Sequence, residues 1–486
     1  MTARRSNSGR VAVFAGVDVG AVLLYAALTL VGFAAILSAS WDDAAENIFA
    51  MSHNYMKQAM WLGVAWFVGL VVLLLDSSIW HKFAYYAYAL GIVALIATLA
   101  LGREVNGAKA WFEFGGVRVQ PMEFAKIAIA LATARMMSDY SFSLNKAGDV
   151  FRVAMLLLVP LAITVLQNDT GSGIVLGSFL FVLYREGLNK WICIPILFIA
   201  ALFIISFLVS PTVLLVALIA IFVLSEAKMN GRWKVCVRYV AGLFLASIVI
   251  KCVLDVVLPD GFDYYKSLLI ATLLSLVVVM WYAYRNNLRN IYVSTAIFFL
   301  SMMFLPTSNF IFESVLREHQ QNRIKSFLGI VNDPGHLDYN VNQSKIAIGS
   351  GGFWGKGYLQ GTQIRYNFVP EKHTDFIFCT IGEETGFVGS VVVLLLMGAL
   401  IMRLMRMGDR QQESFGRVYC YCVAAILLFH TLVNVGMTIG IVPVMGIPLP
   451  FISYGGSSLV AFTILVFIAF SLDASTRKEL PTYGAR

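Results

Sequence analysis

Side chains that could carry out chemistry gather in residues 342–378, which read NQSKIAIGSGGFWGKGYLQGTQIRYNFVPEKHTDFIF. This stretch is rich in glycine and contains Lys356, Lys372, His373 and Asp375, whereas long apolar runs lie on both sides of it. Carboxylate and imidazole groups transfer protons, and ammonium groups stabilise negative charge. Because loops on a rigid scaffold carry function more often than the scaffold does, the stretch predicts chemistry at a membrane surface.

Three smaller polar clusters lie near the ends of other apolar runs: Lys109 with Trp111, Glu123 with Lys126, and Asp169. An ionised group costs about 2.5–3.5 kcal/mol at the centre of a membrane-spanning helix, so such groups are functional candidates. The topology derived below puts all three clusters on the same side of the membrane as the glycine-rich stretch. We therefore expect a single site on the outer side.

Each of these clusters also has a purely structural interpretation. Lys109 and Arg118 could extend towards lipid headgroups, and Trp111 could anchor the chain at the membrane interface. Glu123 and Lys126 are three residues apart, so they could form no more than an ion pair within one helix.

The two aspartates and the glycines have structural alternatives as well. Asp169 and Asp375 could each cap the helix that follows. The glycines of GSGGFWGKG could form a phosphate-binding nest or only a bent loop. A P-loop is excluded, because the segment has no GK[ST] and no strand is expected before it.

The composition is that of a membrane protein. Of the 486 residues, 59% are hydrophobic and 13% are charged, whereas a soluble domain has roughly a quarter charged residues. Apolar runs of about 20 residues predict an all-α polytopic membrane protein. The formal charge of +8 fits cytoplasmic loops beside anionic headgroups, so membrane lipids are expected partners and nucleic acid is not. None of the six cysteines belongs to a CxxC motif, and we interpret them as small buried apolar side chains.

Basic residues, which stay in the cytoplasm, orient the spans of the first part of the chain. With residues 1–10 inside, the first outer loop carries Asp42, Asp43 and Glu46. Six spans are expected before the basic YREGLNK segment, near 16–37, 58–75 and 83–101, then three that end near 136, near 166 and at YREGLNK itself.

The middle of the chain holds five further apolar runs, at 191–209, 212–224, 237–258, 267–284 and 290–305. The Ser210-Pro211 pair could be a kink within one helix instead of a turn between two. A long outer loop follows, with an interfacial helix at 311–328. Three last spans are expected near 376–402, 418–439 and 451–472.

These spans total about fourteen, or twelve if the region of Pro211 is one kinked helix and another run is re-entrant. They divide the chain into four parts: an N-terminal part of the membrane core (1–187), an enlarged transmembrane region (188–306), the large extracytoplasmic loop (307–374), and the last three spans with a cytoplasmic tail (375–486).

Seven motifs, in this order, resemble the SEDS (shape, elongation, division and sporulation) family of cell-wall polymerases: GAKAW, QPMEFAK, QNDTGSG, QSKIAIGSGGFWGKGYLQGTQ, VPEKHTDFIF, IGEETGFVG and NVGMTIGIVPVMGIPLPFISYGGSS. The QSKIAIGSGG, GKG and GTQ segments are more similar to the RodA elongation branch than to the FtsW division branch. The resemblance covers residues 106–454 except 188–306. It implies a SEDS-type helical bundle of about ten core helices, to which the enlarged region would add about four.

The resemblance implies a multi-pass peptidoglycan glycosyltransferase of the bacterial cytoplasmic membrane. Its members polymerise lipid II, a disaccharide-pentapeptide on undecaprenyl diphosphate, at the outer face of that membrane, alongside a crosslinking class B penicillin-binding protein. The aspartate of the family's HTDF motif is essential and corresponds to Asp375, with the role of general base on the 4-hydroxyl of the acceptor sugar. The other functional positions that match the family are Trp111, Glu123, Lys126 and Asp169.

Glycosyl transfer from a diphosphate donor agrees with these residue types. A carboxylate must take the hydroxyl proton, and cations must hold the leaving diphosphate. Asp375 is expected to stay ionised beside Lys372 and His373, and His373 joins the predicted substrate-binding set. The cations expected to face the diphosphate are Lys126, Lys109, Lys356, Lys57, Arg118 and Lys372.

No resident metal site is expected from the residue spacing. Asp169 and Glu123 could orient Lys126 or bind a divalent cation such as Mg²⁺ or Mn²⁺, and we favour orientation because no metal-ligand spacing is visible. The chain also departs from the family pattern. Asn168 stands where the family has proline, and Ala110 stands where it has arginine, which leaves the local turn and the nearby cation open.

Other functions fit the same features. A flippase would carry the same precursor through a basic, lipid-accessible cavity, a division-type polymerase would share the motifs, and a scaffold would only hold the penicillin-binding protein. Replacement of Asp375 separates a polymerase from the non-polymerase alternatives: a polymerase loses strand synthesis, a flippase keeps some transport, and a scaffold still supports normal cell shape.

Overall fold

The computed structural model describes residues 16–41, 53–105, 107–115, 117–257, 263–315, 318–327 and 339–479. The predicted cytoplasmic residues 1–10 and the acidic residues of the first outer loop, Asp42, Asp43 and Glu46, lie outside this part of the chain. Internal packing divides the chain into two units, Met1–Asn189 with Asn332–Arg486, and Lys190–Val331. The first unit holds every residue predicted for the site.

The N-terminal half of the first unit is a series of apolar helices interrupted by a small sheet. Pro121 begins α4, where its missing N–H leaves no hydrogen bond unmade. In chain order the elements are α1 (Val19–Ala39), α2 (Asn54–Leu74), α3 (Ser78–Leu101), β1 (Arg103–Val105), β2 (Ala108–Phe114), β3 (Val117–Val119), α4 (Pro121–Met137), α5 (Ala147–Leu166), α6 (Thr170–Ile174), the 3₁₀ turn η1 (Val175–Ser178) and α7 (Phe179–Arg185).

A small sheet forms between α3 and α4, in a segment where no membrane span was predicted. Its three strands are antiparallel in the order β1-β2-β3, and Arg103 pairs with Trp111 while Phe112 pairs with Val119. The turns contain Gly107 and Gly115, both with positive φ, a conformation that glycine adopts without strain. Trp111 therefore lies in the central strand of a short sheet, between β1 and β3.

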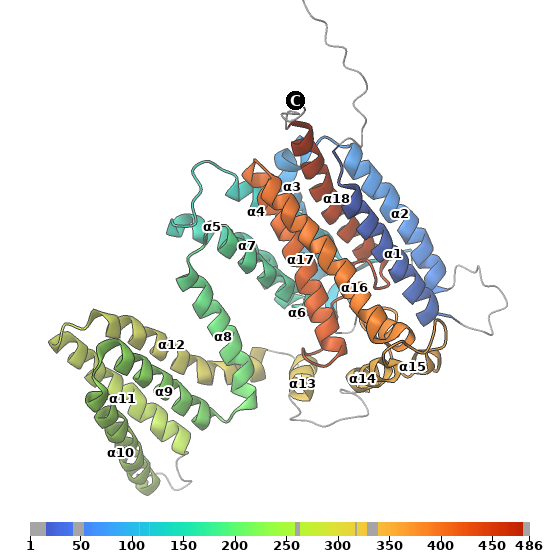
Figure 1. The fold of residues 1–486 in the computed structure, drawn as a ribbon. Coiled ribbons are helices and arrows are strands. Elements are labelled where there is room, and N and C mark those ends of the chain that lie inside the picture. Colours follow the sequence, from blue (N-terminus) through green and yellow to red (C-terminus); the bar gives the residue numbers. More distant parts are fainter. Residues whose placement is uncertain are drawn as a thin grey trace, which may run out of the picture. The chain divides into compact units, whose positions relative to one another are not determined.

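The C-terminal half of the first unit consists of α14 (Tyr339–Gly351), α15 (Thr362–Arg365), α16 (Ile377–Arg410), α17 (Ser414–Thr438) and α18 (Gly456–Glu479). The glycine-rich stretch is thus not a loop throughout, because its first ten residues belong to α14. At Gly351 a side chain would lie 2.0 Å from the carbonyl oxygen of Gly382. Glycine at this position therefore lets α14 pack directly on the backbone of α16. In Figure 1, α16 runs beside α17 and α1, and α18 beside α2.

The second unit contains the helices α8 (Lys190–Leu208), α9 (Pro211–Asn230), α10 (Trp233–Val257), α11 (Tyr264–Arg285) and α12 (Arg289–Phe310), followed by the short π-helix η2 (Ile311–Val315) and α13 (Glu318–Phe327). The five predicted apolar runs are thus five helices. Ser210 is the extended N-cap of α9 and Pro211 its first residue, so this pair separates two helices and is not a kink.

Eleven helices of the described chain are long and apolar enough to cross a membrane, and 79% of the described residues are helical. The prediction of a polytopic helical membrane protein is therefore confirmed. Three further helical segments are shorter, namely Pro121–Met137, Thr170–Arg185 and Lys190–Phe203. The total of about fourteen spans stays a prediction.

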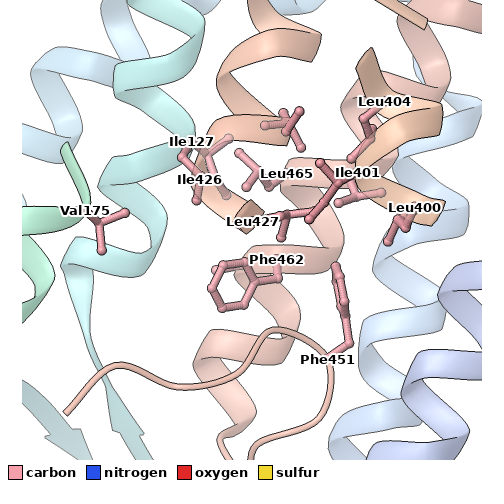
Figure 2. Close-up of a cluster of buried hydrophobic side chains, with 14 of the residues drawn as sticks. Ile127, Val175, Leu400, Ile401, Leu404, Ile426, Leu427, Phe451, Phe462 and Leu465 are labelled. Atoms are coloured by element: carbon pink, nitrogen blue, oxygen red, sulfur yellow. The ribbon is translucent and has the colours of Figure 1, made fainter. Parts of the chain in front are cut away.

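The core of the first unit is a continuous cluster of buried apolar side chains (Figure 2). Phe462 and Leu465 of α18 meet Ile426 and Leu427 of α17, and α16 and α4 supply the surrounding side chains. Between helices in lipid, close packing of this kind is a main source of stability.

A network of charged side chains ties together one end of the first unit, which we call the basic end. Asp18, just before α1, accepts hydrogen bonds from Arg403 at 2.7 Å and Arg477 at 2.9 Å, while Arg410 contacts Asp473 at 3.0 Å. The start of α1 and the ends of α16 and α18 therefore lie together. These are the segments whose basic residues predict a cytoplasmic location. The opposite end, where α4 and α16 begin, is the site end.

Gly386 provides a test of how α16 is built. Its backbone angles of φ 66° and ψ −160° break the regular helix, and a side chain would meet the backbone nitrogen of Gly355 at 2.3 Å. We expect Gly386→Ala to lower the melting temperature sharply or to prevent folding, because non-glycine residues in such conformations cost on the order of 1–3 kcal/mol even without a clash.

The matched control is Gly398→Ala in the same helix, where the added methyl group would meet nothing within 4 Å besides the helix's own nearby backbone. Alanine is the better helix former, so this variant should melt at the same temperature or higher. Equal melting temperatures for the two variants in detergent would contradict the described contact between Gly386 and Gly355.

Candidate functional site

The backbone around Asp375 is fixed by three consecutive carbonyl groups. The carbonyl oxygen of His373 accepts a hydrogen bond from the backbone N–H of Tyr454 at 2.8 Å. That of Thr374 accepts from the Ser453 hydroxyl at 2.7 Å, and that of Asp375 accepts from the Asn434 side-chain amide at 2.9 Å. The donors come from α17 and from residues 439–455, which join α17 to α18 and are called the connecting segment below.

The Asp375 side chain is partly exposed and faces the connecting segment. Its Oδ2 lies 3.6 Å from the position that a side chain on Gly446 would occupy. Gly446 has φ +68°, a conformation that favours glycine. The N-cap position of α16 is Phe376, one residue after Asp375, so the capping alternative for Asp375 stays a prediction.

The ammonium group of Lys126 is buried at the same end. Lys126 is only 1% exposed. Its Nζ donates to Glu123 Oε1 at 2.9 Å, lies 2.9 Å from Nε2 of His430, and sits 5.0 Å from the ring centre of Phe462. The predicted ion pair with Glu123 is therefore present, and it is buried. A direct contact between Lys126 and a diphosphate requires the ammonium to be uncovered, so that role stays a prediction.

Helix α17 links Lys126 to the connecting segment. His430 uses its other ring nitrogen, Nδ1, to contact the carbonyl oxygen of Pro448 at 3.1 Å. Asn434, one helical turn later, donates to the carbonyl oxygen of Ile447 at 2.8 Å as well as to that of Asp375. Two neighbouring carbonyl groups of the connecting segment are thus held by one face of α17.

Asp169 reaches the same connecting segment from α6. Its carboxylate caps this helix by accepting from the Ser172 N–H at 3.3 Å, and it also accepts from the Gln120 amide at 2.6 Å. A side chain on Gly171 would lie 2.1 Å from the carbonyl oxygen of Met445. The helix start at Asp169 therefore packs directly on the backbone just before Gly446.

Lys109, Trp111 and Lys57 lie at the site end without a described contact to Asp375. The backbone N–H of Lys109 donates to the Gln167 carbonyl at 2.9 Å, and its ammonium reaches the Ala100 carbonyl at 3.4 Å. Trp111 is in β2 and partly exposed. Lys57 is exposed in the first turn of α2. These groups border the site, and their contacts with substrate stay predictions.

Lys356 belongs to a separate structure built around Glu383. The Glu383 side chain is fully buried and accepts from Lys356 at 2.6 Å and from the backbone N–H groups of Gln363 at 2.9 Å and Ile364 at 3.0 Å. The Lys356 ammonium also donates to the Thr362 hydroxyl at 2.7 Å. Lys356 thus holds the loop between α14 and α15 in place, and its contact with a diphosphate stays a prediction.

Of the two residues expected to keep Asp375 ionised, Lys372 and His373, the histidine does not carry the positive charge. Burial lowers the pKa of His373 below its ordinary value, an effect that Lys372 reinforces and Glu371 opposes. His373 is therefore neutral at pH 7 and adds no positive charge. The ammonium of Lys372 donates to the Ile364 carbonyl at 2.5 Å.

The carboxylate and imidazole side chains described at the site end do not form a ready-made metal site. Among the described residues, no three His, Cys, Asp or Glu side chains are grouped as metal ligands. Asp169 is engaged by Gln120 and Ser172, and Glu123 by Lys126. A divalent cation here would need oxygen ligands from the substrate itself.

Sequence reasoning missed four of the residues that organise the site: His430, Asn434, Glu383 and Gln120. Three of them lie within motifs that carry the family resemblance but had no role assigned to them. His430 had its own signal, because an ionisable residue within an apolar helix is a functional candidate by default.

Comparisons with known proteins agree with the motifs. The pattern of the FtsW/RodA/SpoVE family, described as cell cycle proteins, matches residues 20–221 and 219–478. The peptidoglycan glycosyltransferase RodA of Treponema pallidum is 32% identical over 93% of this chain and 96% of its own length. The peptidoglycan glycosyltransferase MrdB of Escherichia coli K12 is 30% identical over 90% of this chain and 87% of its own. A probable peptidoglycan glycosyltransferase FtsW of Trichlorobacter lovleyi is 26% identical over 95% and 94%.

Two solved structures share the fold. One, from work on the coordination of polymerization and crosslinking by a peptidoglycan synthase complex, has a TM-score of 0.59 and 22% identity over 95% of this chain and 98% of its own. The rod shape determining protein RodA of Thermus thermophilus has a TM-score of 0.53 and 22% identity over 96% and 98%.

The Glu383 cluster can be tested by a double-mutant cycle. Glu383→Gln should lower stability by about 1–3 kcal/mol, because the Lys356 ammonium and two backbone N–H groups lose their charged acceptor. In the Glu383→Gln/Lys356→Met variant no unpaired ammonium remains, so part of the loss should be recovered. Melting temperatures in detergent give the coupling, and strictly additive effects would show that the two side chains do not interact.

Proposed function

This chain belongs to the FtsW/RodA/SpoVE family, and on that premise we propose that it is a RodA-type peptidoglycan glycosyltransferase whose general base is Asp375. It polymerises lipid II into glycan strands at the outer face of the bacterial cytoplasmic membrane, for cell elongation and rod shape. The observation that carries the proposal is the setting of Asp375: a partly exposed carboxylate on a backbone fixed by three hydrogen bonds, at the end of the bundle that also holds Glu123, Lys126 and Asp169.

The proposed step is a displacement at the anomeric carbon of the donor sugar. The carboxylate of Asp375 removes the proton from the 4-hydroxyl group of the acceptor sugar, and that oxygen forms the new glycosidic bond. The bond from the anomeric carbon to the diphosphate breaks, and undecaprenyl diphosphate leaves with the bonding electron pair. A rigid backbone at the base favours this reaction because the carboxylate is already in place when the acceptor arrives.

The leaving diphosphate needs positive charge, and two groups of cations surround the site. Lys57, Lys109 and Lys372 lie at the site end, Lys57 exposed and the other two partly exposed, and they are proposed to face the diphosphate directly. Lys126, paired with Glu123, is proposed to act from the interior by fixing the geometry of the site. Asp169 is proposed to help in the same way, through the start of α6 that packs on the connecting segment. Trp111 and His373 are proposed to border the substrate at this end, and Lys356 is proposed to act through the loop that it holds against Glu383. If a divalent cation takes part, it would arrive with the diphosphate.

The predicted membrane orientation agrees with this assignment. The basic end carries arginines of the segments predicted to be cytoplasmic, and Asp375 lies at the other end. We infer that a crosslinking partner, a class B penicillin-binding protein, meets the chain from the outer side. This inference rests on the family resemblance. It also rests on the similar fold of a chain from a peptidoglycan synthase complex that coordinates polymerization and crosslinking.

Asp375→Asn should abolish strand synthesis while lipid II binding stays within about threefold of the original, because the amide keeps the shape but cannot accept the proton. The measurement is gel analysis of the products formed from fluorescent lipid II by the purified protein with its partner. The matched control is Asp139→Asn at the basic end, which should leave synthesis unchanged. Strand synthesis by Asp375→Asn would remove the assigned base, and retained lipid II transport without synthesis would favour the flippase.

The elongation role follows from the relatives, since the RodA and MrdB proteins reach 32% and 30% identity and the FtsW protein 26%. Expression of this chain with its own partner should restore rod shape to cells depleted of their RodA, and it should not restore septum formation to cells depleted of FtsW. Cell width and filament length measure the two outcomes. Rescue of septation alone would assign the division role instead.

A further inference from the structure

His430 occupies an unusual place for an ionisable side chain. It is 1% exposed, lies within the apolar helix α17, and is flanked by the edge-on ring of Phe462 at 4.9 Å. Its two ring nitrogens have different partners on different elements, Lys126 of α4 and Pro448 of the connecting segment. No feature of the reaction requires another proton carrier at this depth, so the explanation must lie in these two contacts.

The partners determine the protonation state of the ring. A carbonyl oxygen only accepts hydrogen bonds, so Nδ1, 3.1 Å from the Pro448 oxygen, carries the hydrogen. An ammonium group only donates, so Nε2, 2.9 Å from Lys126 Nζ, must be the bare acceptor. The geometry therefore assigns the neutral Nδ1–H tautomer to His430. An imidazolium would place a second positive charge against the Lys126 ammonium.

The two contacts make a continuous connection to the reacting acid. The chain of bonds runs from Glu123 through Lys126 and His430 to the Pro448 carbonyl. The preceding carbonyl, of Ile447, is held by Asn434, which also holds the carbonyl of Asp375. Gly446, next to Ile447, borders the Asp375 carboxylate.

We propose that His430 is a positioning residue: its neutral ring couples the buried Lys126 to the connecting segment, and the connecting segment in turn fixes where the Asp375 carboxylate lies. This inference rests on the proposed function, because the effect of His430 on turnover is seen only if Asp375 is the base. His430 touches no reacting atom. Its loss should lower the rate of the chemical step and leave substrate binding nearly unchanged.

The test compares kcat and KM for lipid II polymerisation by the purified protein with its partner. His430→Phe keeps a flat ring against Phe462 but removes both polar contacts. We expect kcat to fall about tenfold to a hundredfold, the range that misplacement of a catalytic group by about 1 Å produces, with KM within about twofold. His430→Gln offers a neutral acceptor and donor of similar reach, so it should recover much of the lost kcat.

His81 supplies a closely matched control. At the basic end, its Nε2 lies 2.7 Å from Arg135 and its ring meets Phe415 edge-on at 5.0 Å, much as His430 meets Lys126 and Phe462. His81→Phe should therefore leave kcat and KM unchanged, although it removes a similar contact between a histidine and a cation. An equal loss of kcat in His81→Phe would show a general effect on the bundle and overturn the proposal.

Two other outcomes also overturn it: a His430→Phe enzyme with the original kcat, or glutamine and phenylalanine variants that lose kcat and lipid II binding together. The unaltered protein and Asp375→Asn are assayed in the same series. The proposed function fails if the unaltered protein makes no strands or if Asp375→Asn still makes them. The positioning role alone fails if Asp375→Asn is inactive while the His430 variants keep the original kcat.

A spectroscopic measurement on the unaltered protein covers the case in which His430→Phe does not fold. The protein is labelled with ¹⁵N-histidine in lipid nanodiscs, and the His430 signal is identified by its disappearance in His430→Gln. We expect the shifts of a neutral ring with hydrogen on Nδ1, at pH 7. An Nε2–H tautomer or an imidazolium would contradict the contacts with Lys126 and Pro448, and so the proposal.

Discussion

The site end of the first unit depends on the burial of one ammonium group, that of Lys126. Removing such an ion from water carries a penalty of several kcal/mol, even after the surroundings relax. Glu123 supplies the opposite charge from the same helix, His430 supplies an acceptor from α17, and Phe462 supplies a ring face from α18. If α17 or α18 moved away, the ammonium would keep its pair with Glu123 but lose the acceptor on His430 or the ring of Phe462, so its contacts link the three helices at this point.

The connecting segment extends this constraint to the reacting acid. Irregular backbone within a membrane protein is tolerated only where its polar groups find partners inside the protein or line a polar cavity. Here His430 and Asn434 bind its carbonyl groups, and Ser453 donates to Thr374 while accepting from Leu449. The bonds that satisfy this backbone are also the bonds that hold the residues next to Asp375. Local stability and placement of the base thus have the same physical origin.

Local properties of the sequence predicted the apolar helices and which of their ends carry basic residues, because hydropathy and the position of basic residues require no knowledge of contacts. The apolar run at 16–37 corresponds to Val19–Ala39, and the arginines at 403, 410 and 477 gather at one end. The small sheet could not be predicted from hydropathy, because its strands have only three or seven residues. The Asn106-Gly107 pair is nevertheless a typical hairpin signal. The role of His430 was also beyond it, because Lys126 lies 304 residues away in the sequence.

The same reasoning separates two kinds of cations that look alike in the sequence. Lys126 and Lys356 each face a buried glutamate, Glu123 or Glu383, and a charge already matched in this way adds little attraction for a new anion. Lys57 is exposed in the first turn of α2 and keeps its ammonium free to pair with an incoming diphosphate. A lysine bound to a buried carboxylate sets the shape of such a site, whereas an exposed one sets its attraction for the substrate, and only the folded structure tells which is which.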